Sequence, residues 1–467
     1  MSPRPAGSLV VFGMSGDLAH KLVLPALYRL EARGELDQPI IGVARSKWTD
    51  ADLRTNARTA VEAALGKLDR KVWSRFAARM SYIQGEYDET ATFDQLKGRL
   101  GARADSAVFY LAVPPSMFST VAASLAREEL NKKSRLVVEK PFGTDLASAM
   151  KLDTELRRFF PEEQIYRVDH FLGKESVEDI FVFRFANALI EPIWNRDHVR
   201  SVQLTFSEKL DVADRGGFYD AVGAIRDVVQ NHLFQVLAYL AMDAPSGSDP
   251  GAEQRERTRL LRAVRALTKR DIVRGQYKGY LNVDGVAKGS TTETFVAMRL
   301  AIDNARWEGV PFYIRTGKCL PTTALEAIVE LKPAARLPQL VHRGGAPDPN
   351  RIRLLLQPET GIVCELQAKS PGSGYETVTV PLAVDFNDEL GPVQLAYERV
   401  LEGALQGSDV HFTSLEAVEQ SWRIVDKVLD CTDQPITYAP GSWGPEEAER
   451  LVGRTGWTEI REGLPKR

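Results

Sequence analysis

Residues 8–18 read SLVVFGMSGDL, in which an apolar run, Ser8–Phe12, leads directly into a glycine-rich turn. A short apolar run bounded by a turn is typical of a buried strand. The segment that follows, Leu18–Arg33, carries leucines at a spacing that favours one face of a helix. These are Leu18, Leu22, Leu24, Leu27 and Leu30. The stretch therefore predicts a strand, a tight turn and a helix, which together begin a parallel sheet.

Further strand-like runs occur in the first third of the chain and are separated by helix-like segments. The predicted strands are Ile40–Val43, Ala107–Val113 and Arg135–Glu139, and Ser116–Glu129 is a predicted helix. Continuous apolar strands that alternate with helices indicate a parallel sheet covered by helices on both faces. We therefore expect an N-terminal doubly wound, Rossmann-like α/β domain over residues 1–172.

The pattern changes beyond about residue 175. Helices predicted over Val177–Leu189 and Ala224–Met242 flank a strand at Val202–Phe206. The later strand candidates alternate with period two and follow one another without helices. They are Thr294–Ala301, Ala327–Lys332, Ile352–Gln357 and Ile362–Gln367. Residues 173–467 are therefore expected to form a larger α+β domain with a mainly antiparallel sheet.

The composition excludes several classes of protein. A chain of 467 residues that is 44% apolar and 26% charged is an ordinary globular protein of two or three domains. With 60 basic and 63 acidic residues, the formal charge of −3 gives no basic excess to attract nucleic acid or an anionic membrane. The N-terminus does not resemble a signal peptide, and no apolar run is long enough to cross a membrane. We expect a cytoplasmic protein.

Three cysteines, Cys319, Cys364 and Cys431, are widely spaced and form no CxxC motif. This spacing argues against a disulfide framework and against a structural zinc site. We therefore expect no bound metal.

The turn after the first strand is the first candidate binding site. It differs from the GxGxxG fingerprint, because Ser15 stands at the third position and Leu18 at the sixth. Gly13 still permits a tight turn, Gly16 lets the backbone approach a pyrophosphate, and the helix that follows offers unpaired N–H groups. Taken alone, the turn is equally compatible with a purely structural role. Its place at the first βα junction favours dinucleotide binding.

The end of the second strand discriminates between cofactors. A site for NAD usually places an acidic residue there to bind the ribose 2′-hydroxyl. Here the strand is followed by Arg45, Ser46 and Lys47, without an acid. An arginine at this place can pair with a 2′-phosphate through two hydrogen bonds, so we predict NADP. The alternative is a solvated surface arginine, and the position favours the cofactor.

Two of the six histidines lie in unusual surroundings. His170 is part of YRVDHFLGKE, which places an acid, several cations and a glycine in one short loop. His232 lies on the predicted helix 224–242, where Asp227, Asn231 and Gln235 are four residues apart and are expected to share a face. A neutral histidine is the usual base for removing a hydroxyl proton near pH 7, and a carboxylate often fixes its tautomer.

Several motifs together resemble glucose-6-phosphate dehydrogenase and occur in the order typical of that family. The resemblance runs from about residue 8 to the C-terminal part of the chain, and the pair formed by DHFLGKE and the QNH helix is highly specific. The motifs are GMSGDLAHKLVLPALYRL, VVEKPFG, YRVDHFLGKE, RGGFYDAVGAIRDVVQNHLFQ, VPFYIRTGK, AYERVLEGAL, SWRIVDKVL and YAPGSWGP.

The resemblance implies NADP-dependent oxidation of D-glucose 6-phosphate to 6-phospho-D-glucono-1,5-lactone, the first step of the oxidative pentose phosphate pathway. By similarity, His232 is the general base that takes the proton of the C1 hydroxyl. Asp169 matches the acid that orients this histidine, and a carboxylate near an imidazole raises its basicity.

The resemblance also implies which residues bind the two ligands. The implied substrate-binding residues are His170, Lys174, Glu208, Asp227, Lys318, Lys140 and Gln357, of which Gln357 is the weakest match. The implied cofactor-binding residues are Gly13, Ser15, Gly16, Asp17, Leu18, Arg45 and Lys140. His170 and Lys174 would hold the 6-phosphate, and Glu208 and Asp227 the sugar hydroxyls. Taken singly, each lysine has an ordinary surface role as its alternative.

Two departures from the family pattern bear on the substrate site. Phe171 stands where the family often has a tyrosine, so one hydrogen-bond donor is lost, at a cost of about 1–2 kcal/mol. Thr323 stands where a cation is expected, and Cys319 where a basic residue is common. Loss of a charge-assisted contact costs roughly 1.5–3 kcal/mol, or about ten- to a hundredfold in kcat/KM.

These departures leave two alternatives to a working glucose-6-phosphate dehydrogenase. One is a related sugar-phosphate dehydrogenase with shifted specificity, and the other is a non-catalytic protein that binds NADP(H). By similarity we expect a homodimer or homotetramer, formed through the larger domain.

Overall fold

The computed structural model describes residues 5–464 apart from 248, 250, 335–336, 343–345, 373, 392 and 462, and it leaves the side chains of residues 214 and 454 undescribed. The chain divides into two compact units. Unit 1 comprises Met1–Glu175, Pro245–Arg255 and Gln394–Glu419, and unit 2 comprises Ser176–Ala244, Glu256–Val393 and Gln420–Arg467. Two later segments of the chain thus complete the N-terminal unit.

Unit 1 is built on a seven-stranded sheet with the order β16-β6-β5-β4-β1-β2-β3. Its strands are β1 (Ser8–Phe12), β2 (Ile40–Ala44), β3 (Met80–Gln84), β4 (Ala107–Leu111), β5 (Arg135–Val138), β6 (Ile165–Val168) and β16 (Phe412–Thr413). All neighbours pair in parallel except β16, which runs antiparallel to β6. The strand order reverses between β1 and β4, which is where a doubly wound sheet opens a crevice for a ligand.

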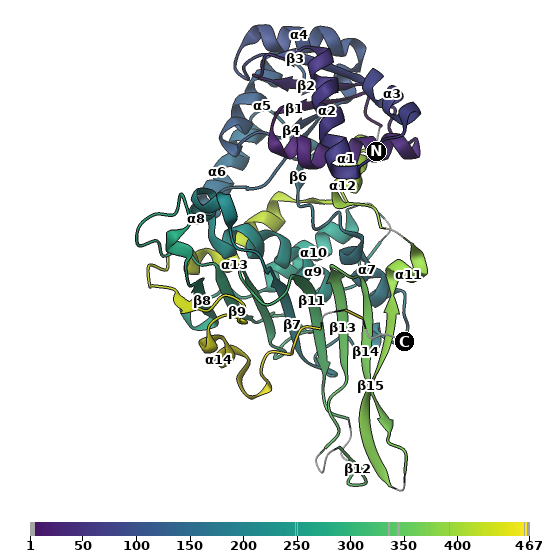
Figure 1. Ribbon diagram of the computed structural model, residues 1–467, viewed down its shortest axis with the longest axis vertical. Helices are drawn as coiled ribbons and strands as arrows, with labels where there is room; N and C mark the ends of the chain where they lie inside the picture. The colour runs from purple at the N-terminus through teal and green to yellow at the C-terminus, as the bar shows by residue number, and fades with distance from the viewer. Residues whose placement is uncertain are drawn as a thin grey trace. The chain divides into compact units, whose positions relative to one another are not determined.

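Helices cover both faces of this sheet, as Figure 1 shows. They are α1 (Leu24–Arg33), α2 (Asp50–Leu65), α3 (Arg70–Ala78), α4 (Thr90–Leu100), α5 (Phe118–Arg127), α6 (Leu146–Arg157) and α12 (Ala396–Gln406). Along β1, Leu9 and Val11 belong to one hydrophobic core, whereas Val10 and Phe12 belong to another. Side chains of a strand alternate between its faces, so two cores imply burial on both sides. The predicted doubly wound fold is confirmed.

The first helix differs in form from the prediction of one α-helix over 18–33. Residues Ala19–Val23 form a π-helical turn, η1, and the α-helix α1 begins at Leu24. Pro25 follows this junction directly, and a proline ring clashes with the carbonyl four residues earlier and has no N–H to donate. The wider π turn relieves the ring clash at this point, and the missing N–H falls in the first turn of α1.

Unit 2 is built on a ten-stranded sheet with the order β12-β15-β14-β13-β11-β7-β10-β9-β8-β17. Its strands are β7 (Val199–Ser207), β8 (Ile272–Tyr277), β9 (Phe295–Leu300), β10 (Phe312–Gly317), β11 (Ala324–Leu331), β12 (Leu340–Val341), β13 (Arg351–Gln357), β14 (Gly361–Lys369), β15 (Tyr375–Asp385) and β17 (Ile436–Tyr438). The pairs β7–β10, β8–β17 and β12–β15 are parallel and the others antiparallel. The predicted, mainly antiparallel sheet is confirmed.

The remaining helices include one long helical segment that carries several candidate residues. The helices are α7 (Glu175–Phe185), α8 (Gly216–Ala224), η7 (Ile225–Leu233), α9 (Phe234–Ala241), α10 (Ala252–Ala263), α11 (Phe386–Leu390), α13 (Leu415–Leu429) and α14 (Glu449–Val452). The helix predicted over 224–242 is present as a helical segment, but its first part, η7, is a π-helix rather than an α-helix. Gly223 (φ 70°, ψ 173°) breaks the helix, and Glu293 Oε1 accepts the Ile225 N–H that follows.

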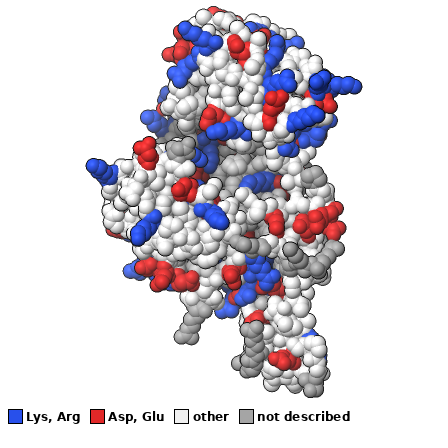
Figure 2. Space-filling view, in the orientation of Figure 1, with Lys and Arg blue, Asp and Glu red and all other residues white. Residues whose placement is uncertain are grey.

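Within the described part of the chain, every helix is too short or too polar to cross a membrane. All three cysteines are free. Basic and acidic side chains are interspersed over the face shown in Figure 2. This mixture agrees with the small formal charge of −3.

Candidate active site

The glycine turn after β1 lies at the point where the strand order of unit 1 reverses. Gly13 has φ 81°, and a Cβ atom there would lie 2.2 Å from the Ala112 carbonyl oxygen, so only glycine fits. The Gly16 N–H donates to the Gly13 carbonyl over 2.8 Å and closes the turn. Ser15 Oγ accepts from Ser46 Oγ at 2.9 Å, which ties the turn to the end of β2. Because glycines at 13 and 16 carry no side chain, the backbone of this turn can approach a pyrophosphate closely.

Two further residues predicted for the cofactor lie at the start of the helical segment. Asp17 is exposed and forms an ion pair with Lys21 at 2.8 Å, and this partner lowers the pKa of the Asp17 carboxyl. Leu18 packs against one of the two hydrophobic cores of unit 1. Leu18 is thus held by the core of unit 1, whereas the Asp17 carboxylate lies at the surface.

Arg45 follows the last residue of β2 and is exposed. With the residues that the structure describes, it forms no ion pair and no hydrogen bond. The Arg45 guanidinium lies at the position where dinucleotide-binding folds contact the ribose of the cofactor. It can therefore bind a 2′-phosphate. The residues present therefore fit NADP.

The segment after β6 carries the acid and cations of the DHFLGKE motif in one tight turn. Asp169 is buried, with 3% of its surface exposed, and its Oδ1 accepts the Phe171 N–H over 3.0 Å. The N–H groups of Leu172, Gly173 and Lys174 donate to carbonyls three residues earlier. The turn fixes Asp169 and Lys174 at the carboxyl edge of the sheet.

Lys174 and Phe171 are packed together within this turn. The Lys174 ammonium lies 3.8 Å from the centre of the Phe171 ring, a cation–π contact. Burial lowers the pKa of Lys174 to about 8, and the Asp169 carboxylate acts in the opposite direction. Phe171 lacks the hydroxyl of a tyrosine, and its ring supports the ammonium that is predicted to hold phosphate.

A buried polar network, which the sequence did not reveal, lies beside His170. Tyr397 of α12 stacks on the His170 ring with 6.0 Å between centroids and an angle of 24°. The hydroxyls of Tyr397 and Tyr110 bond to Glu139, which is 6% exposed and whose pKa is raised by burial. Lys140 follows Glu139 directly, after β5. The AYERV motif contained Tyr397, but its spacing gave no sign of this contact.

In unit 2, the parallel pairing of β7 with β10 brings Glu208 next to Lys318. Ser207 is opposite Gly317 in the register, so the residues that follow leave the sheet side by side. Lys318 Nζ lies 2.6 Å from Glu208 Oε2, and both side chains are partly buried. A carboxylate, which accepts hydrogen bonds, and a cation are therefore available at one strand edge.

Tyr219 of α8 is a second residue that sequence reasoning missed. Burial raises the pKa of Tyr219 well above its usual value, and the nearby carboxylates of Asp227, Glu293 and Glu208 add to this shift. The Lys318 ammonium lies 5.6 Å from the centre of its ring. Asp227, Glu208 and Lys318 therefore all lie near Tyr219 in unit 2.

His232 lies on the π-helix η7 and is 3% exposed. Its backbone N–H donates to Asn231 Oδ1 over 2.6 Å, and Asn231 Nδ2 donates to the Arg226 carbonyl. The predicted face of 227, 231 and 235 assumed an α-helical period. In a π-helix the hydrogen bond spans five residues, so Asp227 and His232 are one turn apart.

Gln357, the last residue of β13, lies further along the same sheet. Its register partner on β11 is Leu325, and Ala324 is opposite Ser207. Thr323 precedes β11, and its hydroxyl accepts the Lys209 N–H over 2.9 Å. Thr323 therefore stabilises the loop after β7, and Gln357 belongs to the same strand edge as Glu208.

Each unit thus gathers its own part of the predicted site. Unit 1 holds the glycine turn, Arg45, Lys140, Asp169, His170 and Lys174, at the carboxyl ends of its parallel strands. Unit 2 holds Glu208, Asp227, His232, Lys318 and Gln357.

Two family models match the chain. Residues 10–179 match "Glucose-6-phosphate dehydrogenase, NAD binding domain", and residues 181–458 match "Glucose-6-phosphate dehydrogenase, C-terminal domain". Glucose-6-phosphate 1-dehydrogenase 1 of Mycobacterium tuberculosis is 42% identical over 96% of this chain and 95% of its own. The enzyme of Aggregatibacter actinomycetemcomitans is 37% identical over 96% of each chain.

Two solved structures share the fold over nearly the whole length. Glucose-6-phosphate 1-dehydrogenase from Mycobacterium avium is 43% identical, with a TM-score of 0.91 over 99% of this chain and all of that one. A glucose-6-phosphate dehydrogenase in complex with its substrate glucose-6-phosphate is 31% identical, with a TM-score of 0.91 over the same shares of the chains. The present chain belongs to the glucose-6-phosphate dehydrogenase family.

Proposed function

We propose that this protein oxidises D-glucose 6-phosphate at C1 to 6-phospho-D-glucono-1,5-lactone and produces NADPH, as the first step of the oxidative pentose phosphate pathway. The observation that carries the proposal is that one sheet edge of unit 1 holds both a glycine turn for a dinucleotide and the Asp169–Lys174 turn. A relative that is 31% identical is described with glucose-6-phosphate as its substrate.

His232 is the general base in this proposal. Its imidazole takes the proton of the C1 hydroxyl, and Asp169 orients the ring and stabilises the imidazolium that forms. When bound, NADP supplies the acceptor for the C1 hydride. Tyr397, which is hydrogen-bonded to Glu139, stacks on the His170 ring and keeps it in position to bind the phosphate.

The ligands are held by two sets of residues. His170 and Lys174 bind the 6-phosphate, and Lys140 reaches both ligands. Glu208 and Asp227 accept hydrogen bonds from the sugar hydroxyls. Lys318 and Gln357 complete the substrate side. The cofactor is bound by Gly13, Ser15, Gly16, Asp17, Leu18, Arg45 and Lys140.

The direct test follows absorbance at 340 nm with glucose 6-phosphate, first with NADP and then with NAD. We expect turnover that favours NADP. Faster turnover of galactose or glucosamine 6-phosphate would replace the proposal by a related specificity. Cofactor binding without turnover of any of these sugar phosphates would contradict it.

Replacement of Arg45 by glutamine is expected to raise the KM for NADP about ten- to a hundredfold, because a charge-assisted pair with the 2′-phosphate is lost. The KM for NAD, which lacks this phosphate, should stay within about twofold. Arg58→Gln is the control, since Arg58 is an exposed arginine whose partner is Glu62 at 2.8 Å. Equal losses with NADP and NAD would remove Arg45 from this role.

The pH profile of kcat/KM is expected to report on Lys174. Its pKa of about 8 means that the ammonium is charged below this pH and neutral above it. Phosphate binding therefore weakens as the pH rises, and kcat/KM for glucose 6-phosphate falls by up to tenfold per unit above pH 8. In Lys174→Arg the charge persists, and the decline should disappear up to pH 10. An identical decline in that variant would assign it to another group.

We also propose that the protein acts in the cytoplasm as a homodimer or homotetramer. One face of β15 leaves Val378, Val380, Leu382 and Val384 between 39% and 61% exposed, which supports a contact between copies. Residues 1–172 are proposed as the NADP-binding domain and 173–467 as the substrate-binding and oligomerisation domain. A monomeric mass by light scattering at micromolar concentration would contradict the oligomer.

A further inference from the structure

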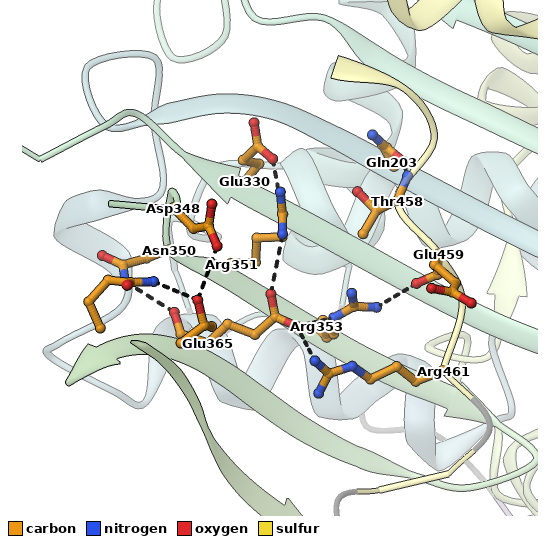
Figure 3. Close-up of polar contacts among 12 residues, drawn as sticks. Gln203, Glu330, Asp348, Asn350, Arg351, Arg353, Glu365, Thr458, Glu459 and Arg461 are labelled. Carbon is orange, nitrogen blue, oxygen red and sulfur yellow. Dashed lines mark hydrogen bonds and ion pairs between the residues drawn. The ribbon is translucent and has the colours of Figure 1, made fainter. Parts of the chain in front are cut away.

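A buried ion network lies on one face of β11, β13 and β14 in the large sheet of unit 2 (Figure 3). Arg353 of β13 is at its centre, with 2.8 Å to Glu326 Oε1 and 2.8 Å to Glu365 Oε1. All three side chains are at most 5% exposed. Arg351, one position further along the same face, pairs with Glu330 at 3.0 Å and lies 3.6 Å from Glu365. The negative charges of Glu326 and Glu365 are thus partly neutralised by arginines of the sheet.

The C-terminal segment lies along this face and is held there by polar contacts. The Thr458 N–H donates to Gln203 Oε1 over 2.8 Å, and Arg353 donates to the Glu459 carbonyl over 3.0 Å. Ile460 belongs to a small hydrophobic core with Ile328. The contacts of Thr458, Glu459 and Ile460 therefore set the position of the next residue, Arg461.

Arg461 brings one more cation to this network. Its guanidinium lies 2.9 Å from Glu365 Oε1, its backbone N–H bonds to Glu326, and 38% of its side chain is exposed (Figure 3). Among the residues that the structure describes, Glu365 is the only ion-pair partner of this guanidinium. A guanidinium has five N–H donors in a fixed plane, so donors remain for a ligand.

The exposed side of Arg461 faces a pocket of about 280 Å³. The lining of this pocket includes Thr322, Thr323, Gln357 and Glu359. The Glu359 carboxylate accepts the Leu464 N–H over 2.7 Å, so it is engaged with the C-terminal backbone. The lining also includes Glu326, whose carboxylate is paired with Arg353 at 2.8 Å. Hydroxyl, amide, carboxylate and guanidinium groups thus converge on one space, as in sites that bind polar ligands.

This pocket lies at the strand edge that carries the proposed substrate residues of unit 2. Gln357 is one of these residues, and the Thr323 hydroxyl accepts the Lys209 N–H directly after Glu208. Thr323 carries no charge, although the family resemblance predicts a cation at its position. Arg461 places a cation in the pocket that Thr323 lines.

We propose that Arg461 is a substrate-binding residue, whose guanidinium contacts the sugar phosphate beside Gln357 and supplies the charge absent at Thr323. The proposal rests on the proposed function, since it names one more group that binds glucose 6-phosphate. Glu365 holds the guanidinium in place from the sheet side, and the remaining donors bind the ligand.

The test measures the KM and, by calorimetry, the Kd of glucose 6-phosphate for Arg461→Gln. Both are expected to rise at least tenfold, since a charge-assisted contact is lost, while kcat and the KM for NADP stay within about threefold. Arg351→Gln is the matched control, because Arg351 pairs with Glu365 and does not line the pocket. Its substrate KM and Kd should stay within twofold, with a comparable loss of thermal stability.

A rescue completes the experiment. Thr323→Arg, added to Arg461→Gln, places a guanidinium in the same pocket from the other wall and is expected to recover at least half of the lost affinity on a logarithmic scale. Unchanged affinity in Arg461→Gln, an equal loss in Arg351→Gln, or absence of rescue would overturn the proposal. Absence of turnover in the unmodified protein would instead overturn the proposed function.

Discussion

The variant His232→Asn is expected to lose about a thousandfold or more in kcat, with KM for both ligands changed by less than about threefold. Asparagine preserves the size of a polar side chain and can hydrogen-bond, but it cannot take up a proton near neutral pH. General base catalysis contributes typically 10²–10⁴-fold to a rate. The backbone N–H of residue 232 keeps its acceptor, Asn231 Oδ1, so the π-helical turn should persist.

The measurement is steady-state NADPH formation, with circular dichroism to verify the fold. His198→Asn is the control, because His198 is an exposed histidine of the same unit and has no role in the proposal. It should retain full activity. A kcat of His232→Asn within tenfold of the unmodified protein would assign the proton transfer to another group.

Much of the fold of unit 1 could be predicted from local sequence, because its signals lie close together. The apolar run Ser8–Phe12, the glycines after it and the leucine spacing are all contained in one βα unit. Glycine is required at position 13 because a Cβ atom there would clash with the carbonyl oxygen of Ala112, which directly follows β4. The residue type and position nevertheless predicted the turn, because few other roles require glycine there.

Five strands of unit 2, β8, β10, β12, β15 and β17, were not predicted, and the helix predicted over 224–242 contains a π-helical part. The π-helix η7 has ordinary helix-forming residues, and its form depends on Gly223 and on Glu293, which lies about 70 residues later in the chain. Strand β15 contains Pro381, and a proline within an apolar run argues against a strand. The strand tolerates it near the edge of the sheet, where its one long partner is β14.

The site shows the same limit. The family resemblance implied Glu208 and Lys318 separately, but their contact at 2.6 Å requires β7 and β10, about 110 residues apart in sequence, to pair in parallel. Tyr219 lay inside a quoted motif and received no role, because only burial among carboxylates singles it out. Arg461 lies in no motif, and its place depends on contacts of the C-terminal segment with the sheet.

The variant Asp169→Asn is expected to lower kcat about 10²–10⁴-fold at pH 7. A carboxylate that orients a catalytic histidine fixes its tautomer and stabilises its cation, and an amide does neither. Asparagine keeps an oxygen for the Phe171 N–H, so the turn should remain folded. Asp153→Asn is the control, since Asp153 is a buried acid of the same unit that pairs with Arg167 at 2.7 Å. It should cost stability and leave kcat nearly unchanged.

A second readout separates an orienting role of Asp169 from a structural one. Asp169 raises the pKa of Lys174 against the effect of burial, so its removal should move the decline of kcat/KM to below pH 8. The double variant Asp169→Asn, His232→Asn should be no slower than His232→Asn alone, because an acid that acts through the base has nothing to act on once the base is gone. Additive losses would mean that the two residues serve separate steps, and the Asp169–His232 pair would have to be abandoned.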